Sequence, residues 1–563
     1  MALSRYLYYS YHIIMIKKLF NGEINSITMA ALLVGASSLI SRFLGIFRDR
    51  ILAGQFGAGD SLDIYYAAFR IPDLIFNLLI LGALSAGFIP IFTSLINSPS
   101  AKIKSLFGDN HKEAWELTSD VLNILAVALL ILCGLGVIFA PQIMRFITPG
   151  FSPEKISLTA GLSRIMFLSP IFLGISSIFG GVLQSFKRFF VYSLSPIFYN
   201  IGIIIGALYL APIWGIYGLA WGVCLGAAAH MLVQVPALIQ LGFRYKFSFN
   251  LRSPKIIKIW LMMVPRTMSL AVSQLNLVVI TIIASTLSSG SLTVFNLANN
   301  LQSFPVGIFG ISFAIAAFPA MSASAFDKKN LVKDLSSTTR QILFFIIPAT
   351  IILLALRAQI IRVVLGSGRF DWQDTVLTVN TLGFFLLSLF AQGLIPLLVR
   401  AFYARHDAKT PFLIGLVTAL ANIFLSIWLS RRLGVAGLAL AFSLASILNL
   451  ILLWLWLNLE IGRIDEMKIF ISTVKFSFAA LVAGAAVQGV KLLIGANIDM
   501  TKFLGVLTQG LVAGVAGIFI YLLVCWILKS QELFDFWSAI KRRWPAKKIE
   551  KVEMSDQGEA RGI

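Results

Sequence analysis

Charged residues are scarce in this sequence: Asp, Glu, Lys and Arg make up 13% of its 563 residues, about half their share in a soluble domain. Hydrophobic residues make up 58%, and the mean hydropathy is +0.88. These values exclude a water-soluble globular protein. The three cysteines each lie inside an apolar run, and the four histidines show no ligand spacing. This pattern excludes a disulfide framework and gives no metal site.

The sequence contains long runs of apolar residues. Four of them approach or exceed the roughly 20 residues that cross a bilayer as a helix: Val121–Phe139, Ile342–Leu356, Leu438–Leu457 and Leu504–Leu528. A membrane β-barrel would need alternating stretches of about ten residues, which these are not. The sequence therefore predicts an all-α polytopic membrane protein.

Pro, Gly and charged residues divide the chain into about fourteen transmembrane helices. The expected spans are 26–51, 62–97, 117–147, 157–186, 192–211, 216–241, 257–287, 292–325, 335–364, 375–404, 411–431, 436–459, 469–494 and 502–529.

The net charge of +21 suggests that the protein could bind nucleic acid. The distribution of the basic residues along the chain argues against that interpretation. With Met1 in the cytoplasm, roughly 28 Lys and Arg fall in inside segments and about 6 in outside ones. We therefore expect a multi-pass plasma-membrane protein with both termini cytoplasmic and no nucleic-acid partner.

Two pairs of similar segments indicate an internal repeat. Phe69-Arg-Ile-Pro72 parallels Gln302-Ser-Phe-Pro305, and Gly215-Ile-Tyr-Gly-Leu-Ala parallels Gly434-Val-Ala-Gly-Leu-Ala. The spacing predicts two six-helix lobes related by a pseudo-two-fold axis, plus two C-terminal helices. Substrates of such parallel repeats bind between the lobes.

The repeat gives a domain plan. It comprises an N-terminal interfacial lead (1–25), an N-lobe (26–241), a basic cytoplasmic linker (242–256), a C-lobe (257–460), a final helix pair (469–529) and a basic amphipathic, then disordered, tail (530–563).

Polar and charged residues gather in the first two expected spans, and the first lobe holds all three obvious acids inside the spans. Ser41, Arg42, Arg48 and Asp49 lie on the first expected helix, and Asp63 begins the second. Such groups normally face a wet interior, and guanidinium matches the oxygens of phosphate. Arg42 with Asp63, or Arg48 with Asp73, would neutralise part of the charge and leave a positive excess for an anion. The alternative is that some of these arginines snorkel to the interface.

Sequence motifs of enzymes are missing: we find neither a phosphate-binding Gly-Lys-Ser/Thr loop nor a metal-spaced His cluster. We therefore expect no enzyme, no metal and no cofactor. Pro72 and Pro305 break long apolar helices and suit gating elements, although proline is common in membrane helices as a simple kink.

Several motifs resemble the MurJ (MviN) lipid II flippases of the multidrug/oligosaccharidyl-lipid/polysaccharide exporter (MOP) superfamily. They are Ser41-Arg42-Phe-Leu-Gly45-Ile-Phe-Arg48-Asp49, Phe56-Gly-Ala-Gly59 with Asp63, Pro265-Arg266, Phe304-Pro-Val-Gly307-Ile-Phe-Gly310, and Arg400-Ala-Phe-Tyr403-Ala-Arg405-His-Asp407-Ala-Lys409-Thr-Pro411. The resemblance covers roughly residues 25–530.

This resemblance implies a flippase that moves undecaprenyl-pyrophosphate-linked disaccharide-pentapeptide to the outer leaflet of a bacterial inner membrane for peptidoglycan synthesis. It implies alternating access around a cationic cavity, with the lipid tail in a groove of the last two helices. Lipid II and membrane lipids are the expected partners, with cell-wall synthesis proteins as candidates, and the chain is expected to act as a monomer. The membrane potential or an ion gradient would drive it.

The resemblance implies the substrate-binding positions Ser41, Arg42, Arg48, Asp63 and Arg266, with Arg48 the first choice for a pyrophosphate contact. The chain departs from the family elsewhere. An arginine pair and a glutamate of the second helix are replaced by Phe76, Asn77 and Leu81, and an Asp-Arg pair and a Glu of the eighth by Asn299, Asn300 and Ser303. Asn299 and Asn300 either bind sugar or peptide groups or join helices.

Two other functions stay open from the sequence. One is a flippase for another polyprenyl-linked glycan, and the other is a membrane scaffold for cell-wall synthesis that transports nothing. An enzyme is a further, weaker alternative.

Overall fold

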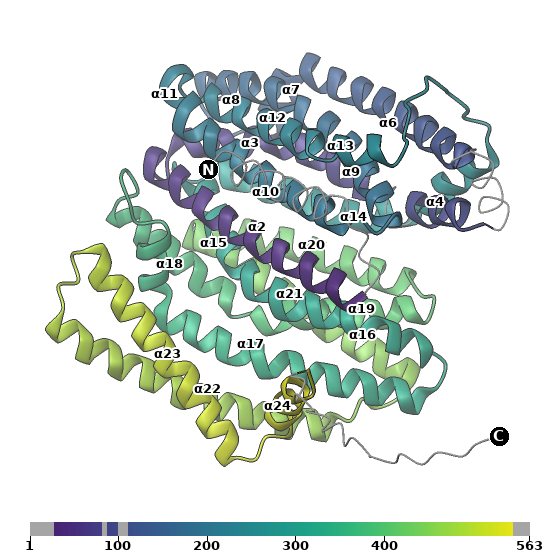
Figure 1. Ribbon diagram of the computed structural model, residues 1–563. Helices are drawn as coiled ribbons and strands as arrows, with labels where there is room; N and C mark the ends of the chain where they lie inside the picture. The colour runs from purple at the N-terminus through teal and green to yellow at the C-terminus, as the bar shows by residue number, and fades with distance from the viewer. Residues whose placement is uncertain (1–26, 82–86, 99–110, 544–563) are drawn as a thin grey trace, which may run out of the picture.

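The computed structural model describes residues 27–81, 87–98 and 111–543. Within these ranges every regular element is a helix and no strand occurs, which confirms the all-α class. Figure 1 shows one group of helices at the top, from α3 to α13, and a second group beneath it, from α15 to α21. Helix α2 runs between the two groups, and α22, α23 and α24 lie along the lower edge.

The first lobe is built from helices in the first half of the chain. They are α2 (Ile27–Phe56), α3 (Asp60–Phe76), η1 (Asn77–Leu81), α4 (Ile89–Ile96), α6 (Lys112–Ile138), α7 (Ala140–Ile147), α8 (Pro153–Met166), α9 (Leu168–Ser185), α10 (Phe189–Ile205), η3 (Gly206–Leu210), α11 (Ala211–Trp214), α12 (Tyr217–Leu232) and α13 (Val235–Gln240). Here η marks a π-helical turn.

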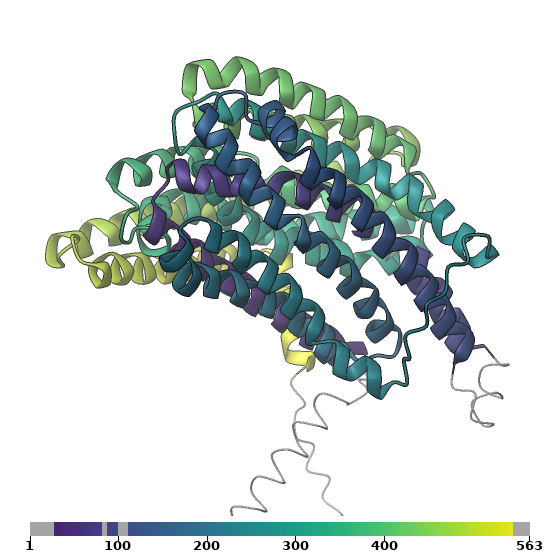
Figure 2. The same ribbon diagram turned by 90° about the horizontal axis from the view of Figure 1, so that it is seen from above.

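The second lobe and the final helices follow. They are α14 (Pro254–Ser285), α15 (Ser291–Pro305), η4 (Val306–Ile311), α16 (Ser312–Ala323), α17 (Lys328–Val364), α18 (Trp372–Leu386), α19 (Leu389–Ala404), α20 (Lys409–Leu433), α21 (Val435–Ile461), α22 (Glu466–Asn497), α23 (Phe503–Ile527) and α24 (Gln531–Arg543). The view from above shows the long helices crossing the molecule side by side (Figure 2).

Ten of the described helical segments are long and apolar enough to cross a bilayer, and eleven if the bent pair α18–α19 is one span. The other three expected spans correspond to α2, to α3 with its continuation, and to α14. Each of the three includes residues that lie outside the described backbone or side chains. The number fourteen therefore stays a prediction, although a helix or a run of helices occupies every expected span.

The internal repeat is visible in backbone geometry. Gly215, before α12, has φ 58° and ψ −143°, and Gly434, before α21, has φ 58° and ψ −137°. This conformation has positive φ, which glycine adopts without the Cβ clash. Pro72 and Pro305 are each followed by a π-helical turn, η1 and η4. The two lobes thus share this turn and a π-helical turn after the proline, as a repeat predicts.

Glycines allow the closest helix contact of the first lobe. A Cβ added at Gly202 of α10 would collide with the backbone of Gly226 on α12, and one added at Gly206 would collide with Gly222. Small residues that bring helix backbones together in this way are typical of membrane proteins, where packing replaces the hydrophobic effect between helices.

We expect Gly202→Ala to destabilise the protein by about 1–3 kcal/mol, the usual cost of overpacking, because the added methyl meets backbone rather than a movable side chain. The measurement is the thermal unfolding midpoint of the purified protein. Gly134→Ala on α6 is the control, since its Cβ would meet nothing within 4 Å. Equal midpoints for the two variants would contradict the expectation.

Candidate functional site

A polar cavity of about 330 Å³ lies where the first lobe meets α14 and α15. We call it the central cavity. Its wall is formed by Arg48, Leu52, Tyr65, Tyr66, Phe69, Arg70, Pro72, Asp73, Phe76, Ser169, Leu173, Tyr199, Ile203, Leu277, Asn296, Asn299 and Asn300. Its size is in the range of small-molecule sites. The position between the repeats is the one that the sequence predicts.

Arg48 of α2 is held on the wall of the central cavity by two neighbours. Its Nε and Nη2 donate to Oδ1 of Asp49 at 3.0 and 2.8 Å, and its Nη1 donates to Oδ1 of Asn200 at 3.2 Å. These contacts use three of the five N–H groups that a guanidinium carries. The remaining N–H groups are available to an anion, and the fork is already oriented.

Ser41 and Arg42 lie on α2 but not on the wall of the central cavity. Asn200 of α10 donates to the Ser41 hydroxyl at 3.2 Å, so Ser41 helps to position the amide that holds Arg48. The Arg42 guanidinium lies against Gly307 of η4, where a Cβ would displace it. Ser41 is thus placed behind Arg48, and Arg42 faces the second lobe.

The asparagines of α15 face the central cavity, and one of them also joins two helices. Asn299 and Asn300 both line the central cavity. Asn300 also donates to Oδ2 of Asp49 at 2.9 Å and so joins α15 to α2. Asp49 therefore fixes Arg48 with one oxygen and the second lobe with the other. Phe76 also lines the cavity.

Arg70 of α3 is a wall residue that the sequence-based choice of site residues omits. Its Nε donates to Thr281 at 2.9 Å and its Nη2 to Asn296 at 3.3 Å, and both partners are neutral. The sequence could have identified Arg70 as a candidate. It lies seven residues, or about two helical turns, after Asp63 and two residues before Pro72, so it shares a helix with both.

The positive excess expected from the sequence is small among the described residues of this site. The cavity wall brings the guanidinium groups of Arg48 and Arg70 together with the carboxylate of Asp73, Asp49 pairs with Arg48, and Arg42 lies apart against Gly307. The side chain of Arg266 lies outside the described residues, although its backbone belongs to α14. Among the residues described, no group of His, Cys, Asp or Glu is placed to hold a metal ion.

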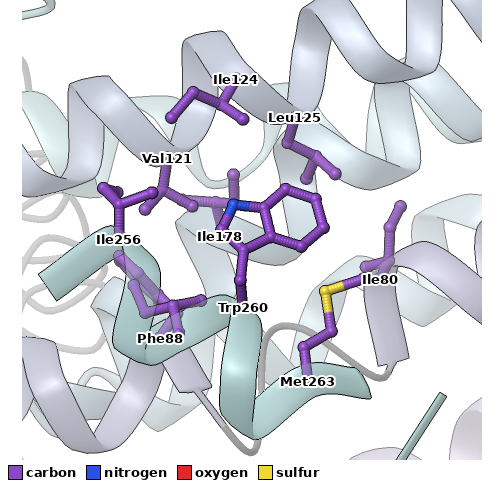
Figure 3. A pocket seen from close by; sticks show the side chains of 10 residues that line it. Ile80, Phe88, Val121, Ile124, Leu125, Ile178, Ile256, Trp260 and Met263 are labelled. Carbon is purple, nitrogen blue, oxygen red and sulfur yellow. The ribbon is translucent and has the colours of Figure 1, made fainter. Parts of the chain in front are cut away.

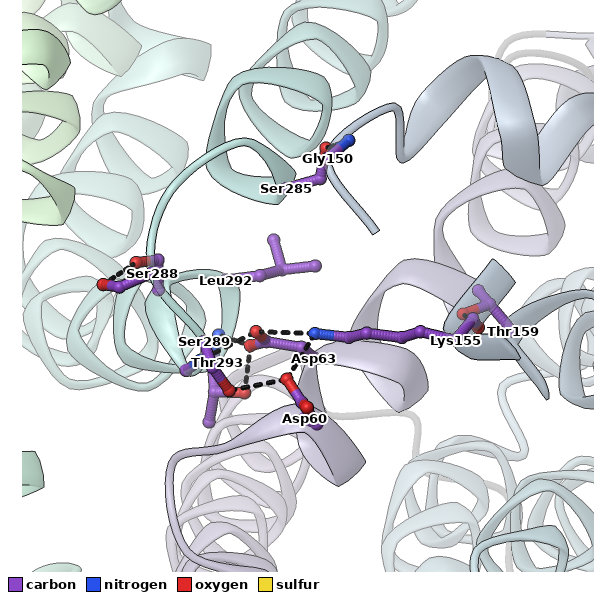
Figure 4. Close-up of polar contacts among 12 residues, drawn as sticks. Asp60, Asp63, Gly150, Lys155, Thr159, Ser285, Ser288, Ser289, Leu292 and Thr293 are labelled. Carbon is purple, nitrogen blue, oxygen red and sulfur yellow. Dashed lines mark hydrogen bonds and ion pairs between the residues drawn. The ribbon is translucent and has the colours of Figure 1, made fainter. Parts of the chain in front are cut away.

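Asp63 lies near the start of α3, in a network that we call the polar closure: Asp60, Asp63, Lys155, Ser289, Gly290 and Thr293. Figure 4 shows Asp60, Asp63, Lys155, Ser289 and Thr293 of this network. The buried Asp63 carboxylate accepts from the backbone N–H groups of Gly290 and Thr293 at 2.8 and 2.9 Å. These groups begin α15, where the helix dipole favours a negative charge. Asp63 thus joins α3 of the first lobe to α15 of the second.

Lys155 of α8 completes the polar closure. Its Nζ lies 2.6 Å from Oδ1 of Asp60 and 3.5 Å from Oδ2 of Asp63. Ser289 donates to the same Asp60 oxygen at 2.6 Å. The pairing of Arg42 with Asp63 considered from the sequence is therefore wrong, and Asp63 does not line the central cavity.

Arg48 likewise pairs with Asp49 and not with Asp73. Asp73 is nevertheless on the cavity wall. The sequence thus predicts that charged residues of these helices form ion pairs, but the ion pairs that it predicts for Arg42 and Arg48 are wrong.

The opposite end of the molecule is closed by apolar side chains, which we call the apolar closure: Ile80, Phe88, Val121, Ile124, Leu125, Ile178, Ile256, Ile259, Trp260 and Met263. Figure 3 shows Trp260 and Met263 of α14 directed toward side chains of the first lobe. Ile259 also approaches Gly87 so closely that a Cβ there would lie 3.0 Å from the Ile259 carbonyl oxygen. The central cavity thus lies between a polar and an apolar closure.

A second, apolar cavity of about 530 Å³ lies on the other side of α2. Ile46 of α2 lines it, together with residues of α15, η4, α17, α18, α23 and α24: Leu301, Phe304, Pro305, Ile308, Phe309, Phe344, Phe345, Pro348, Ala349, Ile352, Leu353, Ile360, Val364, Leu382, Ile518, Tyr521, Leu522 and Phe536. The one polar atom of Tyr521 is satisfied, since its hydroxyl donates to the Phe344 carbonyl at 2.7 Å.

The two proline positions each border a cavity. Pro72 lines the central cavity and Pro305 lines the apolar one. The π-helical turns that follow them interrupt the regular hydrogen-bond ladder of α3 and α15, which is where such helices bend most readily. A gating role for these two residues stays a prediction.

Two helical lobes of parallel repeat, with a polar cavity between them and a closure at each end, define a transporter of the alternating-access class. A family model described as "Lipid II flippase MurJ" matches residues 52–541. The chain belongs to this family, as its motifs predict.

Individual proteins of this family are similar to the chain over most of its length. The chain is 30% identical to a "Probable lipid II flippase MurJ" of Thermotoga maritima over 499 residues, which cover 88% of this chain and 95% of the relative. It is 29% identical to the lipid II flippase MurJ of Burkholderia cenocepacia over 444 residues, which cover 76% of this chain and 83% of the relative.

Solved structures share the architecture. "Lipid II flippase MurJ, inward closed conformation" aligns with a TM-score of 0.72 and 26% identity over 91% of this chain and all of that one. An inward-facing multidrug resistance MATE family transporter of the MOP superfamily aligns with a TM-score of 0.61 over 78% of this chain and 99% of that one, at 14% identity. The second match shows the fold alone. The predicted class of an all-α polytopic protein with a transporter fold is confirmed.

Proposed function

We propose that this chain moves lipid II across the inner membrane of a bacterium, with the pyrophosphate head in the central cavity and the polyprenyl chain in the apolar cavity. The observation that carries the proposal is the position of α2 between two cavities of opposite character. Arg48 lines the polar one and Ile46 the apolar one. Residues two apart point to nearly opposite sides of a helix, so one helix contacts both parts of an amphiphile.

Arg42 supports the same arrangement. It lies four residues before Ile46 and so shares its side of α2, and its guanidinium contacts Gly307, beside the apolar lining residues of η4. A positive charge at the edge of the apolar cavity suits the place where an anionic head joins an apolar tail. Guanidinium binds phosphate oxygens through paired N–H groups.

The bias of basic residues assigns the sides of the membrane. With both termini in the cytoplasm, the polar closure faces outward and the apolar closure faces the cytoplasm. The side chains of the apolar closure separate without breaking hydrogen bonds among themselves, and the Lys255–Glu113 ion pair that joins α14 to α6 beside it is exposed to water. This suits entry of the head from the inner leaflet. Release to the outside requires the contacts of Asp63 and Lys155 to break. The chain contains both cavities by itself and acts as a monomer.

The test uses cells depleted of their own lipid II flippase that express this chain. We expect it to restore the lipid II that an externally added pyrophosphate-cleaving enzyme can reach. Protein that is inserted and abundant but restores no exposure would overturn the proposal. A gain in exposure of another polyprenyl-linked glycan in the same cells would identify that glycan as the substrate.

We expect transport to depend on membrane potential but not on sodium. Among the described residues of α14 to α21, the acids lie in loops, at helix ends or within the first two turns of a helix. Inside this lobe Asn276, Asn422 and Asn449 form a neutral cluster, with Asn422 donating to Asn276 at 3.2 Å. One net positive charge moved through 100 mV is worth about 2.3 kcal/mol.

The measurement is lipid II exposure in spheroplasts. Replacement of sodium by choline is expected to leave the rate unchanged, and a potassium–valinomycin clamp at zero potential is expected to lower it severalfold. A loss of transport in choline that sodium restores would place a sodium site in the second lobe after all.

A further inference from the structure

The last helix, α24, is attached to the membrane domain through a buried carboxylate. Glu532 is 4% exposed. Its Oε1 accepts from Nη1 of Arg340 on α17 at 2.5 Å and from the Ser472 hydroxyl on α22 at 2.8 Å, and its Oε2 accepts from Ser530 at 2.9 Å. The sequence predicts only an amphipathic segment here. The structure ties that segment to two other helices.

This carboxylate is held in its charged form. Burial alone would raise the pKa of Glu532, but hydrogen bonds from its own backbone amide, from Ser472 and from Ser530, together with Arg340, outweigh burial and leave the pKa below its usual range. A buried ion pair whose remaining lone pairs are satisfied is costly to break by removing one partner. The attachment is therefore intact at neutral pH.

One turn further along α24, Phe536 reaches the apolar cavity and forms part of its lining. Its ring lies 5.3 Å from that of Phe345 on α17, nearly edge to face. The side chain is still 42% exposed, so it lies at the mouth of the cavity and not in its interior. Phe534 and Trp537 of the same helix are 46% and 59% exposed and are not part of the lining.

We propose that α24 is a lid on the apolar cavity, held shut by the Glu532–Arg340 ion pair, and that Phe536 fills the mouth through which an isoprenoid chain enters. The proposal rests on the function proposed above, because it takes a polyprenyl lipid as the occupant. The cavity favours that occupant by its apolar lining, by its size of about 530 Å³ and by Arg42 at its edge. The ion pair sets how often the mouth is open, and the aromatic contact covers it.

The experiment measures entry into the cavity directly. The full chain in proteoliposomes is illuminated with a polyprenyl pyrophosphate that carries a diazirine at the end of its tail, and labelled residues are located by peptide mass spectrometry. In the native protein we expect labels on α17 and α23. Phe536→Ala removes an aromatic pair, and we expect roughly a two- to tenfold rise in labelling. Arg340→Gln with Glu532→Gln, which removes both charges, is expected to raise it too.

A control variant on the same helix tests whether the effect is specific to Phe536. Phe534→Ala removes a similar ring on the same helix that does not face the cavity, and it should leave the labelling unchanged. Unchanged or lower labelling in Phe536→Ala would overturn the proposal, because Phe536 would then be absent from the path or a part of the binding wall. Size-exclusion profiles establish that each variant is folded.

Lipid II exposure measured in parallel distinguishes this proposal from the proposed function. If transport is normal and the cavity is never labelled, the lid proposal fails and the flippase proposal survives. If neither labelling nor transport occurs, the flippase proposal fails with it.

Discussion

Arg48→Ala is expected to abolish lipid II transport while the protein remains folded and inserted. The substitution removes the guanidinium fork that Asp49 and Asn200 orient toward the central cavity. Hydrogen bonds to charged groups contribute about 1.5–3 kcal/mol each, so we expect binding of the pyrophosphate head to weaken by roughly 10- to 100-fold for each one lost. Exposure of lipid II to an external pyrophosphate-cleaving enzyme measures the result.

Arg48→Lys refines this expectation. Lysine keeps the charge but has no planar fork, and it cannot donate to Asp49 and a phosphate in the same way. We therefore expect transport between that of the native protein and that of Arg48→Ala. A lysine variant as inactive as the alanine variant would show that the bidentate geometry matters more than the charge.

The matched control is Arg164→Ala on α8. This arginine is exposed, and its Nε donates to the Val137 carbonyl at 3.2 Å, away from both cavities. We expect transport close to that of the native protein. If Arg48→Ala and Arg164→Ala behave alike, the anion does not bind at α2, and Arg70 becomes the next residue to test.

The sequence predicts the helices and their repeat well because both depend on local patterns. Apolar runs between Pro, Gly and charged residues mark the helices, and the Gly215 and Gly434 motifs locate two turns of almost equal φ and ψ. The sequence also identifies Arg48 as a candidate site residue, because it belongs to a recognisable motif and is a charged residue inside an expected transmembrane span. These signals lie within a few residues of each other in the chain.

Pairings between distant helices are harder to predict. Arg42 and Asp63 are 21 residues apart in the sequence, but about 14 residues of α2, some 21 Å at 1.5 Å per residue, separate Arg42 from the helix end near which Asp63 lies. The partner of Asp63 is Lys155, more than 90 residues away in the sequence. A charged residue indicates that a partner is needed but not which helix supplies it.

The burial of Glu532 could not be predicted from the sequence either. From the sequence it is one acid in a segment of aromatic and basic residues, and such a segment is typical of a membrane-surface helix. Its burial depends on Arg340 and Ser472, which come from two other helices. The attachment of α24 is therefore a property of the folded bundle and not of its own amphipathic pattern.

Locking the polar closure with a covalent bridge is expected to stop transport completely and reversibly. Asp60 and Ser289 come from different lobes, and their side-chain oxygens lie 2.6 Å apart. In a protein whose buried cysteines at 133, 224 and 525 are replaced, Asp60→Cys with Ser289→Cys places two thiols within reach of a short bifunctional methanethiosulfonate. Because the Asp60 side chain is 64% exposed, the reagent has access. Reduction should restore lipid II exposure.

The control bridge joins two residues that stay together throughout the cycle. Asp499→Cys with Lys502→Cys links side chains 3.6 Å apart within the turn between α22 and α23, so the same reagent should form this bridge without any effect on transport. If the Asp60–Ser289 bridge forms quantitatively and lipid II still reaches the outer leaflet at the native rate, the polar closure does not open during transport. Release would then have to follow a path that leaves α3 and α15 in contact, and Asp63 would be a structural tie between the lobes and not part of a gate.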